Sequence, residues 1–520
     1  MFGVQGRRNL KIIIPAVLLC LAIFILSSYA SPVPVIPIIL QTRTGLVTNV
    51  YFETVTGPST STPSPNTSMT SPTESGSYMI SKGSTGYFWS PQFATTTTIN
   101  GGKWVVDLWG ALGVTAIYDV PITITNSEML TTSNIFQQKI TWNPSTYSSY
   151  EASDLGNIRF YSDSSCSVPL YGWLESCTPS LSNNAASATA WVRLTHSISG
   201  KGRTTIYMAF LPTSTSYDGL YWGTSPNLSP TYSQNDNGVR VFNFYDNFAG
   251  TTITSDWNTI GAEGTYSVNN GLTINSAVVP GYTLTLKNQY TGPLIIDAYQ
   301  VSTWGNWIGA SFSNLQTTDT SYTLTSGSVQ WVYPPQGSYF SGVCIPSGSV
   351  AFTPDPPSTT LQIVTLAVNS TSATGYQNYA NSATVSGEIP LINYPGLVQL
   401  SYDSSNTEIT YWFRIRAYPP SNVMPTTSIG SLTTPSGSAN ISIQITDSSG
   451  NVLTTMASNI QTQTLGPTKT QIIVDVDGSP IDIPRDGYVS VTIFSTSSPL
   501  IIYWGSSQYS NFQVPFRVLT

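Results

Sequence analysis

Short β-strand patterns separated by turn residues fill residues 153–211 of this chain. Apolar and aromatic residues gather in three segments, and Asp, Ser, Pro and Gly stand between them. We predict strands over residues 158–161, 191–198 and 204–210. No stretch after residue 30 shows the spacing of three and four residues that marks an amphipathic helix. The chain is therefore predicted to be all β.

Composition supports packed sheets and excludes one class of partner. Only 8% of the residues are charged while 12% are aromatic, whereas a disordered chain would carry more charge and fewer aromatic rings. The net charge is −7, and no basic cluster follows the first eleven residues, so nucleic-acid binding is excluded. A length of 520 residues predicts two to four domains.

Two parts of the chain resemble known families. Residues 241–248 (VFNFYDNF) resemble the opening of a concanavalin A-like lectin and glucanase-type sandwich. Such a sandwich commonly follows the domain of unknown function 2341 of exported archaeal and bacterial proteins. The resemblance to that domain lies in residues 154–161, 173–176, 191–194 and 205–207. The resemblance implies architecture and a surface location, and it supplies no catalytic residue.

Strand counting predicts the domain organisation. The N-terminal flank holds about four strands, too few for a sandwich alone, and the C-terminal flank holds about five, so together they reach the strand count of a jelly roll. We expect them to form one split jelly-roll base around the central modules; the alternative is a loose stalk plus a separate C-terminal sandwich. The predicted segments are 1–30 (hydrophobic helix), 31–112 (first half of the base, with a Ser/Thr/Pro-rich segment at 56–77), 113–238 (domain of unknown function), 239–430 (concanavalin-like sandwich) and 431–520 (second half of the base).

The N-terminus predicts export. Arg7, Arg8 and Lys11 precede the apolar run 12–29, an order that keeps the N-terminus inside and sends the remainder out of the cell. A cleaved signal peptide and a retained membrane anchor both fit this run. The location is predicted to be the outer face of the membrane or the medium.

Cysteines and sequons add predictions that follow from export. Cys166 and Cys177 close a short loop and are predicted to form a disulfide, while Cys344 is predicted to be a buried thiol. Four sequons predict exposed turns that a glycosylating host would modify, at Asn66, Asn227, Asn369 and Asn440.

The sequence offers little support for a catalytic site. His196 is the only histidine, and its spacing from apolar neighbours predicts a core or edge position rather than a catalytic base. Laminarinase-like enzymes place their acids close together on one strand, and that run is missing. The acids of the concanavalin-like segment stand singly and are predicted to be solvated charges: Glu263, Asp297, Glu388 and Glu408. Residues 408–418 alternate aromatic side chains with Arg414 and Arg416.

Sugar binding needs only an aromatic platform and a few hydrogen bonds. The candidate ligand-binding residues are Trp304, Asn306, Trp307, Trp331 and Tyr333, although these aromatics could equally be sheet core. Calcium would fit a lectin-like sandwich, with Asp246 and Asn247 as oxygen donors.

These observations favour a non-catalytic surface protein that binds extracellular polysaccharide or a surface glycoprotein. Two alternatives stay open: a self-associating subunit of a surface sheath or appendage, and a polysaccharide-degrading enzyme.

Overall fold

The computed structural model is nearly all β, as the strand pattern predicts. Short strands within 34–56 are described, followed by residues 76–90, 92–99, 101–259, 266–275, 281–302, 306–314, 328–333, 340–347, 349–354, 360–380, 382–401, 407–504 and 511–515. The apolar N-terminal segment, the sequon at Asn66, Trp304 and Glu263 lie outside these residues. No helix in this part of the chain is long and apolar enough to cross a membrane.

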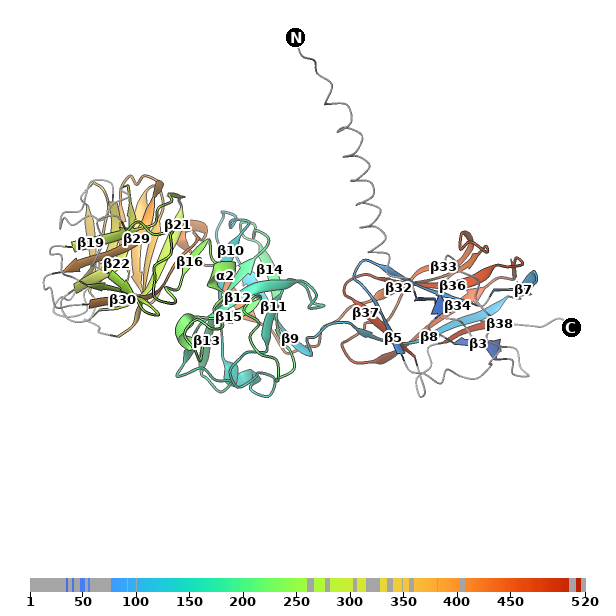
Figure 1. Ribbon diagram of the computed structural model, residues 1–520. Coiled ribbons are helices and arrows are strands. Elements are labelled where there is room, and N and C mark those ends of the chain that lie inside the picture. The colour runs from blue at the N-terminus through green and yellow to red at the C-terminus, as the bar shows by residue number, and fades with distance from the viewer. Residues whose placement is uncertain are drawn as a thin grey trace, which may run out of the picture. The chain divides into compact units, whose positions relative to one another are not determined.

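The chain divides into two compact units (Figure 1). The first combines residues 1–115 with 434–520, and the second contains residues 116–433. The boundaries expected from strand counting, after residues 112 and 430, lie within three residues of this division.

The first unit is a sandwich whose sheets mix strands from both ends of the chain, so this unit contains both blue and red strands in Figure 1. One sheet has the order β2-β3-β38-β8-β37-β5, with β34 also paired to β8, and the other has the order β33-β32-β36-β6. Its strands are β1 (Pro34–Val35), β2 (Leu40–Gln41), β3 (Val47–Tyr51), β4 (Val55–Thr56), β5 (Gly76–Ile80), β6 (Thr85–Trp89), β7 (Thr97–Ile99), β8 (Gly102–Leu112), β32 (Ala439–Thr446), β33 (Val452–Gln461), β34 (Thr470–Gly478), β35 (Ile481–Ile483), β36 (Tyr488–Ser495), β37 (Leu500–Trp504) and β38 (Asn511–Pro515).

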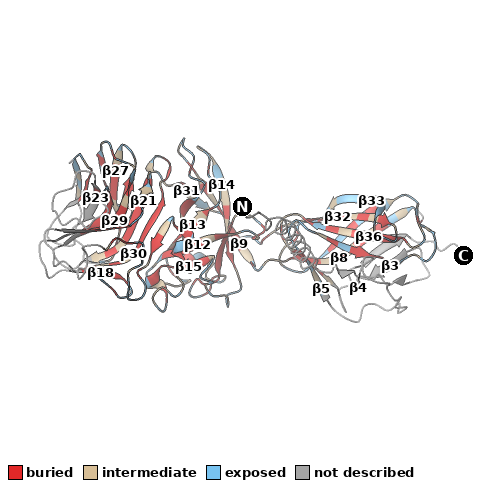
Figure 2. Ribbon diagram, turned by 45° about the horizontal axis from the view of Figure 1, so that its top comes forward, coloured by how far each residue is buried: buried red, intermediate tan, exposed pale blue. Residues whose placement is uncertain are grey.

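β8 is the strand on which this sandwich depends. It pairs with β34, β37 and β38, all from the C-terminal flank. Trp104, Val106 and Leu108 point from one face of β8 into the core, as their alternate spacing predicts, and pack there with side chains of the second sheet. Figure 2 shows the same alternation of buried and exposed positions along the strands.

The second unit begins with an eight-stranded sheet of order β10-β13-β12-β11-β14-β9-β31, with β15 beside β12. Side chains from both ends of this sheet join one core cluster, so the sheet wraps around it. Its strands and short helices are β9 (Tyr118–Thr125), β10 (Phe136–Trp142), η1 (Pro144–Tyr147), β11 (Ile158–Tyr161), β12 (Pro169–Thr178), β13 (Ser187–Leu194), β14 (Arg203–Phe210), β15 (Trp222–Thr224), η2 (Pro226–Leu228), α2 (Gly238–Val241), η3 (Pro420–Asn422) and β31 (Thr426–Ile429).

Two sheets packed over a second core follow α2. Their orders are β17-β18-β30-β21-β26-β27-β28, with β16 beside β30, and β19-β29-β22-β23-β24-β25, with β20 beside β29. The strands are β16 (Phe244–Asp246), β17 (Tyr266–Val268), β18 (Leu272–Asn275), β19 (Gly281–Thr285), β20 (Tyr290–Thr291), β21 (Leu294–Ser302), β22 (Asn306–Ser313), β23 (Ser328–Tyr333), β24 (Phe340–Cys344), β25 (Val350–Pro354), β26 (Gln362–Val368), β27 (Ser372–Gln377), β28 (Ser382–Ser386), β29 (Ile392–Ser401) and β30 (Thr407–Ala417).

The sandwich of residues 244–417 is inserted within the preceding module rather than following it. After β30 the chain returns, and β31 pairs with β9, the first strand of the unit. The expected end of the concanavalin-like segment at residue 430 is therefore too late, because β31 belongs to the other sheet. Asp119 and Thr433 exchange backbone hydrogen bonds of 3.0 and 2.7 Å where the unit begins and ends. Entry and exit thus lie side by side, the geometry that makes insertion tolerable.

The predicted disulfide is wrong. Cys166 is buried in a small cluster with Ala116 and Ala209, whereas Cys177 lies in β12, and no disulfide joins them. An extended strand advances about 3.3 Å per residue, so Pro169 to Cys177 covers roughly 26 Å. Bridged cysteines need Cα atoms within about 7 Å. The segment between them is a strand rather than a closing loop. Cys344 is buried in β24, as expected.

A fragment of residues 434–520 is predicted not to unfold cooperatively, because it lacks β8, to which β34, β37 and β38 pair. Thermal melts followed by circular dichroism test this. Residues 116–433 provide the control and should melt cooperatively. A sharp transition in the 434–520 fragment would show instead that the C-terminal flank is an independent domain.

Candidate functional site

The second unit contains two modules: the wrapped sheet (β9 to β15 with β31) and the sandwich of residues 244–417. They meet along β30, a strand of the sandwich. Phe413 and Ile415 point into the core of the 244–417 sandwich, so the alternate residues Trp412, Arg414 and Arg416 lie on its other face. That face packs against β10, β12 and β13 of the first sheet. Gln137 of β10 illustrates the contact, since its side chain accepts from the Ala417 amide at 2.8 Å and donates to the Val241 carbonyl at 3.1 Å.

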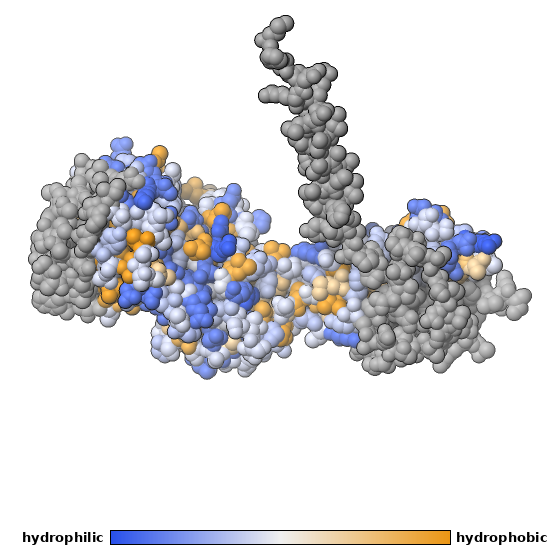
Figure 3. Space-filling view, viewed as in Figure 1, coloured by the Kyte–Doolittle hydropathy of each residue, from blue (hydrophilic) through white to orange (hydrophobic). Residues whose placement is uncertain are grey.

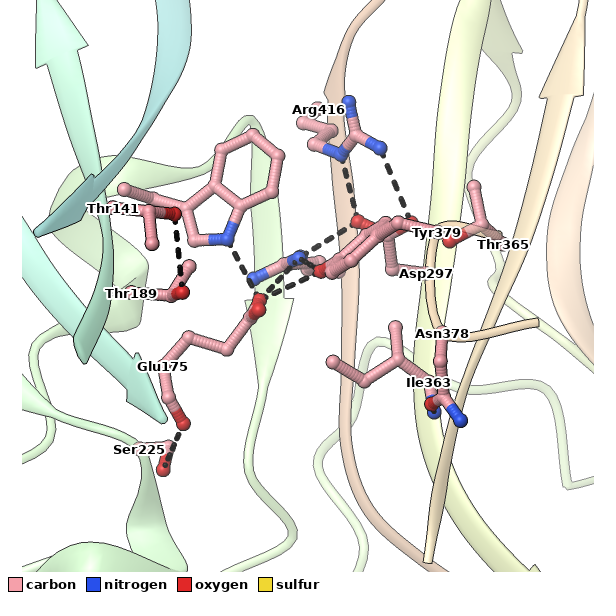
Figure 4. A network of polar contacts seen from close by, with 12 residues as sticks. Thr141, Glu175, Thr189, Ser225, Asp297, Ile363, Thr365, Asn378, Tyr379 and Arg416 are labelled. Atoms are coloured by element: carbon pink, nitrogen blue, oxygen red, sulfur yellow. Dashed lines mark hydrogen bonds and ion pairs between the residues drawn. The ribbon is translucent and has the colours of Figure 1, made fainter. Parts of the chain in front are cut away.

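The Arg414 guanidinium joins the two modules. It contacts the Glu175 carboxylate of β12 at 2.7 Å and the Asp297 carboxylate of β21 at 2.8 Å. The Tyr379 hydroxyl accepts from Arg414 at 2.5 Å and donates to Glu175 at 2.7 Å, and Trp191 Nε1 also donates to Glu175 at 2.7 Å. Figure 4 shows Glu175 and Asp297 converging on the junction from opposite sides. All of these ionic groups are buried.

Aromatic rings surround the same guanidinium. Its central carbon lies 4.5 to 5.4 Å from the ring centres of Trp173, Trp191, Phe242 and Trp412. The face of an aromatic ring is electronegative and attracts a cation, most strongly away from water. The junction therefore compensates the buried charge both by ion pairs and by ring faces.

Arg416 extends the network toward the surface. Its Nε donates to Asp297 at 2.7 Å, and its side chain stacks 4.6 Å from the Trp191 ring centre. Burial alone would raise the pKa of the Asp297 carboxyl, but Arg416 and Arg414 outweigh it and lower that pKa to about 2. The Arg416 Nη1 group is buried and has no hydrogen-bond partner.

A pocket of about 180 Å³ opens beside Arg416. Strands of both modules and the segment after β30 line it, namely with Lys139, Trp191, Ile295, Thr365, Tyr376, Tyr379, Arg416, Pro419, Asn422 and Met424. Asn422 donates to the Tyr376 hydroxyl at 2.7 Å, which orients two of the polar groups. The lining thus combines ring faces, an amide, hydroxyls and two cations.

Lys139 lies directly opposite Trp191 in the β10 and β13 register, and its ammonium stands 4.5 Å from the Tyr379 ring centre. Burial lowers the pKa of this ammonium; the Glu175 carboxylate opposes the shift, and Arg416 and Arg414 add to it. Within the described part of the chain, no carboxylate lies within ion-pair distance of it. Sequence reasoning missed Lys139, because nothing local distinguishes it from a surface lysine. The alternating arginines near residue 414 were the one available signal.

The sequence-predicted ligand residues lie elsewhere. Asn306 and Trp307 belong to β22, and Trp331 and Tyr333 to β23, but their side chains are outside the described residues. The backbone register sets Trp331 opposite Ala310 and Tyr333 opposite Ile308. Their role as a sugar platform stays a prediction.

The suggested calcium donors have structural partners. Asp246 accepts from the Phe248 amide, the Thr254 hydroxyl and the Trp257 indole at 2.8 to 2.9 Å. Asn247 donates to Asp236 at 2.8 Å. Among the described residues there is no group of three or more acidic, His or Cys side chains suited to a metal.

Several expectations for single residues are corrected. Asp297 and Glu408 are fully buried rather than solvated, whereas Glu388 is exposed as expected. His196 lies beyond the end of β13 and is exposed, so it is not a core residue. Asn440 lies inside β32, with strands paired on both sides, rather than in a turn. The side chain of Asn369 is engaged with Ser372 and Tyr418, whereas Asn227 is exposed in η2.

Comparison with known proteins gives few relatives to argue from. No family model matches the chain, so the resemblance to domain of unknown function 2341 stays a prediction. An uncharacterized protein, 562, of Sulfolobus islandicus rod-shaped virus 1 is 30% identical over 346 residues, which is 60% of this chain. The chain spans 59% of the length of that relative.

Similar solved structures cover about a third of the chain. An endo-β-1,3-glucanase from Pyrococcus furiosus is 11% identical with a TM-score of 0.27, over 34% of this chain and 94% of the glucanase. The carbohydrate-binding module CBM66 from Bacillus subtilis is 10% identical with a TM-score of 0.25, over 31% and 95%. Scores this low carry no argument about function.

Replacing Arg414 with Ala is predicted to destabilise the second unit by about 3 to 5 kcal/mol, because Glu175 and Asp297 would stay buried with less compensation. Denaturant unfolding measures the loss. Arg203→Ala is the matched control, since Arg203 is exposed and should change stability little. A loss below 1 kcal/mol for Arg414→Ala would contradict the structural role of this network.

Stability is predicted to fall as pH rises from about 4.5 to 8. Burial raises the pKa of Glu151 and Glu408 to about 8, although hydrogen bonds from Trp142 and Thr410 oppose the shift. Across this range the unfolded chain releases these protons while the folded chain keeps them. Each group therefore lowers the unfolding free energy by about 1.4 kcal/mol per pH unit.

Unfolding free energies measured between pH 4.5 and 8 test this slope. The double variant Glu151→Gln, Glu408→Gln should flatten it, and Glu388→Gln, at an exposed site, should not. An unchanged slope in the double variant would refute the assignment.

Proposed function

We propose that the chain binds an extracellular glycan, without cleaving it, in the pocket beside Arg416. The lining of this pocket carries the proposal: the rings of Trp191, Tyr376 and Tyr379 stand with an amide and hydroxyls around one small space. Aromatic rings pack against the apolar face of a pyranose, and amides and hydroxyls bond its hydroxyl groups.

Two features support recognition rather than hydrolysis. Glycoside hydrolysis by the common route needs two carboxyl groups across the scissile bond, and no Asp or Glu is among the residues that line the pocket. At about 180 Å³ the pocket is below the roughly 300 to 1,000 Å³ of a drug-sized site, and it suits one sugar residue rather than an extended chain.

On the face of the molecule in Figure 3, the described surface mixes hydrophilic and hydrophobic residues in small groups. The proposed location is outside the cell, as the N-terminal pattern indicates.

A second candidate function is self-association into a surface layer or appendage. β33 is an edge strand that pairs with β32 on one side, and Val452 and Leu453 on it are half exposed. An exposed apolar edge strand can pair with another copy of the chain.

Screening the purified chain on a glycan array, with an assay for released sugar, tests the first function. Binding without release is expected, and Tyr376→Ala should weaken it about tenfold, because a stacking ring is lost. Tyr87→Ala, in the first unit, is the matched control. Released sugar would favour the enzyme alternative. Absence of binding combined with concentration-dependent sedimentation would favour self-association.

A further inference from the structure

We propose that the pocket beside Arg416 selects an acidic sugar, one that carries a carboxylate or a sulfate ester. This inference rests on the proposed function, because it names the class of glycan that the same pocket takes. The positive charge around the pocket supports an anionic ligand.

The charges around the pocket do not cancel. Arg414 and Arg416 supply two positive charges, and Glu175 and Asp297 supply two negative ones. The Lys139 ammonium, which stands over the Tyr379 ring, adds a third positive charge when it is protonated. Both carboxylates bond to arginines, and neither lies within ion-pair distance of Lys139.

The surplus lies at the pocket itself. Arg414 is enclosed by carboxylates and rings, whereas Lys139 and Arg416 both line the open space. Figure 4 shows two of the Arg416 guanidinium nitrogens directed at Asp297. Asp297 is shared with Arg414, so it does not balance both arginines. An anionic group in the pocket would balance the charge of the two cations that line it.

The aromatic lining of the pocket favours an acidic sugar over a small free anion. Lys139 stands over the Tyr379 ring and Arg416 over the Trp191 ring, which leaves Tyr376 as the lining ring available to stack on a ligand. A small anion would leave this ring without a contact. A uronate or a sulfated sugar offers a ring for Tyr376, hydroxyl groups for the polar lining, and a charged group for the two cations.

Matched pairs of monosaccharides test the inference on the full chain. Galacturonate with galactose, glucuronate with glucose and mannuronate with mannose each differ by one carboxylate, and galactose 6-sulfate adds the sulfate ester. In calorimetric titrations at fixed ionic strength, at least one acidic sugar should bind about tenfold or more tightly than its neutral partner. The carboxylate and sulfate arms identify which acid is preferred.

Lys139→Gln should abolish this preference while leaving the weaker affinity for the neutral sugar. Lys201→Gln, an exposed lysine of the same unit, has the same net charge and should keep the preference. Thermal melts confirm that both variants are folded. Lys139 is the better probe because Arg416 also pairs with Asp297 and its loss would disturb the fold.

Three outcomes would overturn the inference. Equal binding of acidic and neutral sugars, with no effect of Lys139→Gln, would leave glycan binding standing but remove the acid preference. Binding of an oligoglutamate peptide that depends on Lys139, with no sugar bound, would assign the pocket to acidic protein segments. Failure to bind either class would remove the proposed function together with the inference.

Discussion

A buried guanidinium holds the second unit together. A charged arginine in a protein interior is costly unless nearby groups compensate its charge. Arg414 is compensated by ion pairs with Glu175 of one module and Asp297 of the other, and by the faces of four aromatic rings. Each module supplies part of that compensation. Separating them would leave charges buried without partners or expose the rings to water. The two modules therefore form one compact unit, although each has its own core.

Insertion occurs at two levels in this chain. Residues 116–433 interrupt the sandwich of the first unit, and residues 244–417 interrupt the wrapped sheet of the second. In the second unit, the Asp119 and Thr433 bonds keep the entering and leaving segments adjacent. An insertion can then grow without disturbing its host sheet. The pocket is a product of this arrangement, because β10 and β13 of the host sheet meet β21, β30 and the returning segment there.

Charge balance gives the pocket its chemical character. A lining of rings and amides alone would offer no charged group to distinguish an acidic sugar from a neutral one. Here the junction needs Arg414 for cohesion, and Arg416 follows it two positions later on the same face of β30. Lys139 faces them from β10. The same charged residues that join the modules thus leave a surplus positive charge where a ligand can enter, which links the stability of the junction to recognition.

Local pattern alone determined the β class, many strand positions and the faces that they bury. Residues 158–161 and 204–210 were predicted as strands and lie in β11 and β14, since alternation with a period of two is a property of consecutive residues. Trp104, Val106 and Leu108 share one face of β8 for the same reason. Only the tertiary structure decided that Asp297 is buried, that Cys166 and Cys177 are apart, that β31 pairs with β9 and that Lys139 meets Arg416. Each of these depends on contacts between residues distant in sequence, and the arginines that allow Asp297 to be buried follow it by more than a hundred residues. From the sequence alone, a single acidic residue is predicted to be exposed, because its ion-pair partner cannot be identified. The physical reason is that periodicity reports the surroundings of a strand's faces, whereas ion pairs, sheet order and pockets depend on which faces meet.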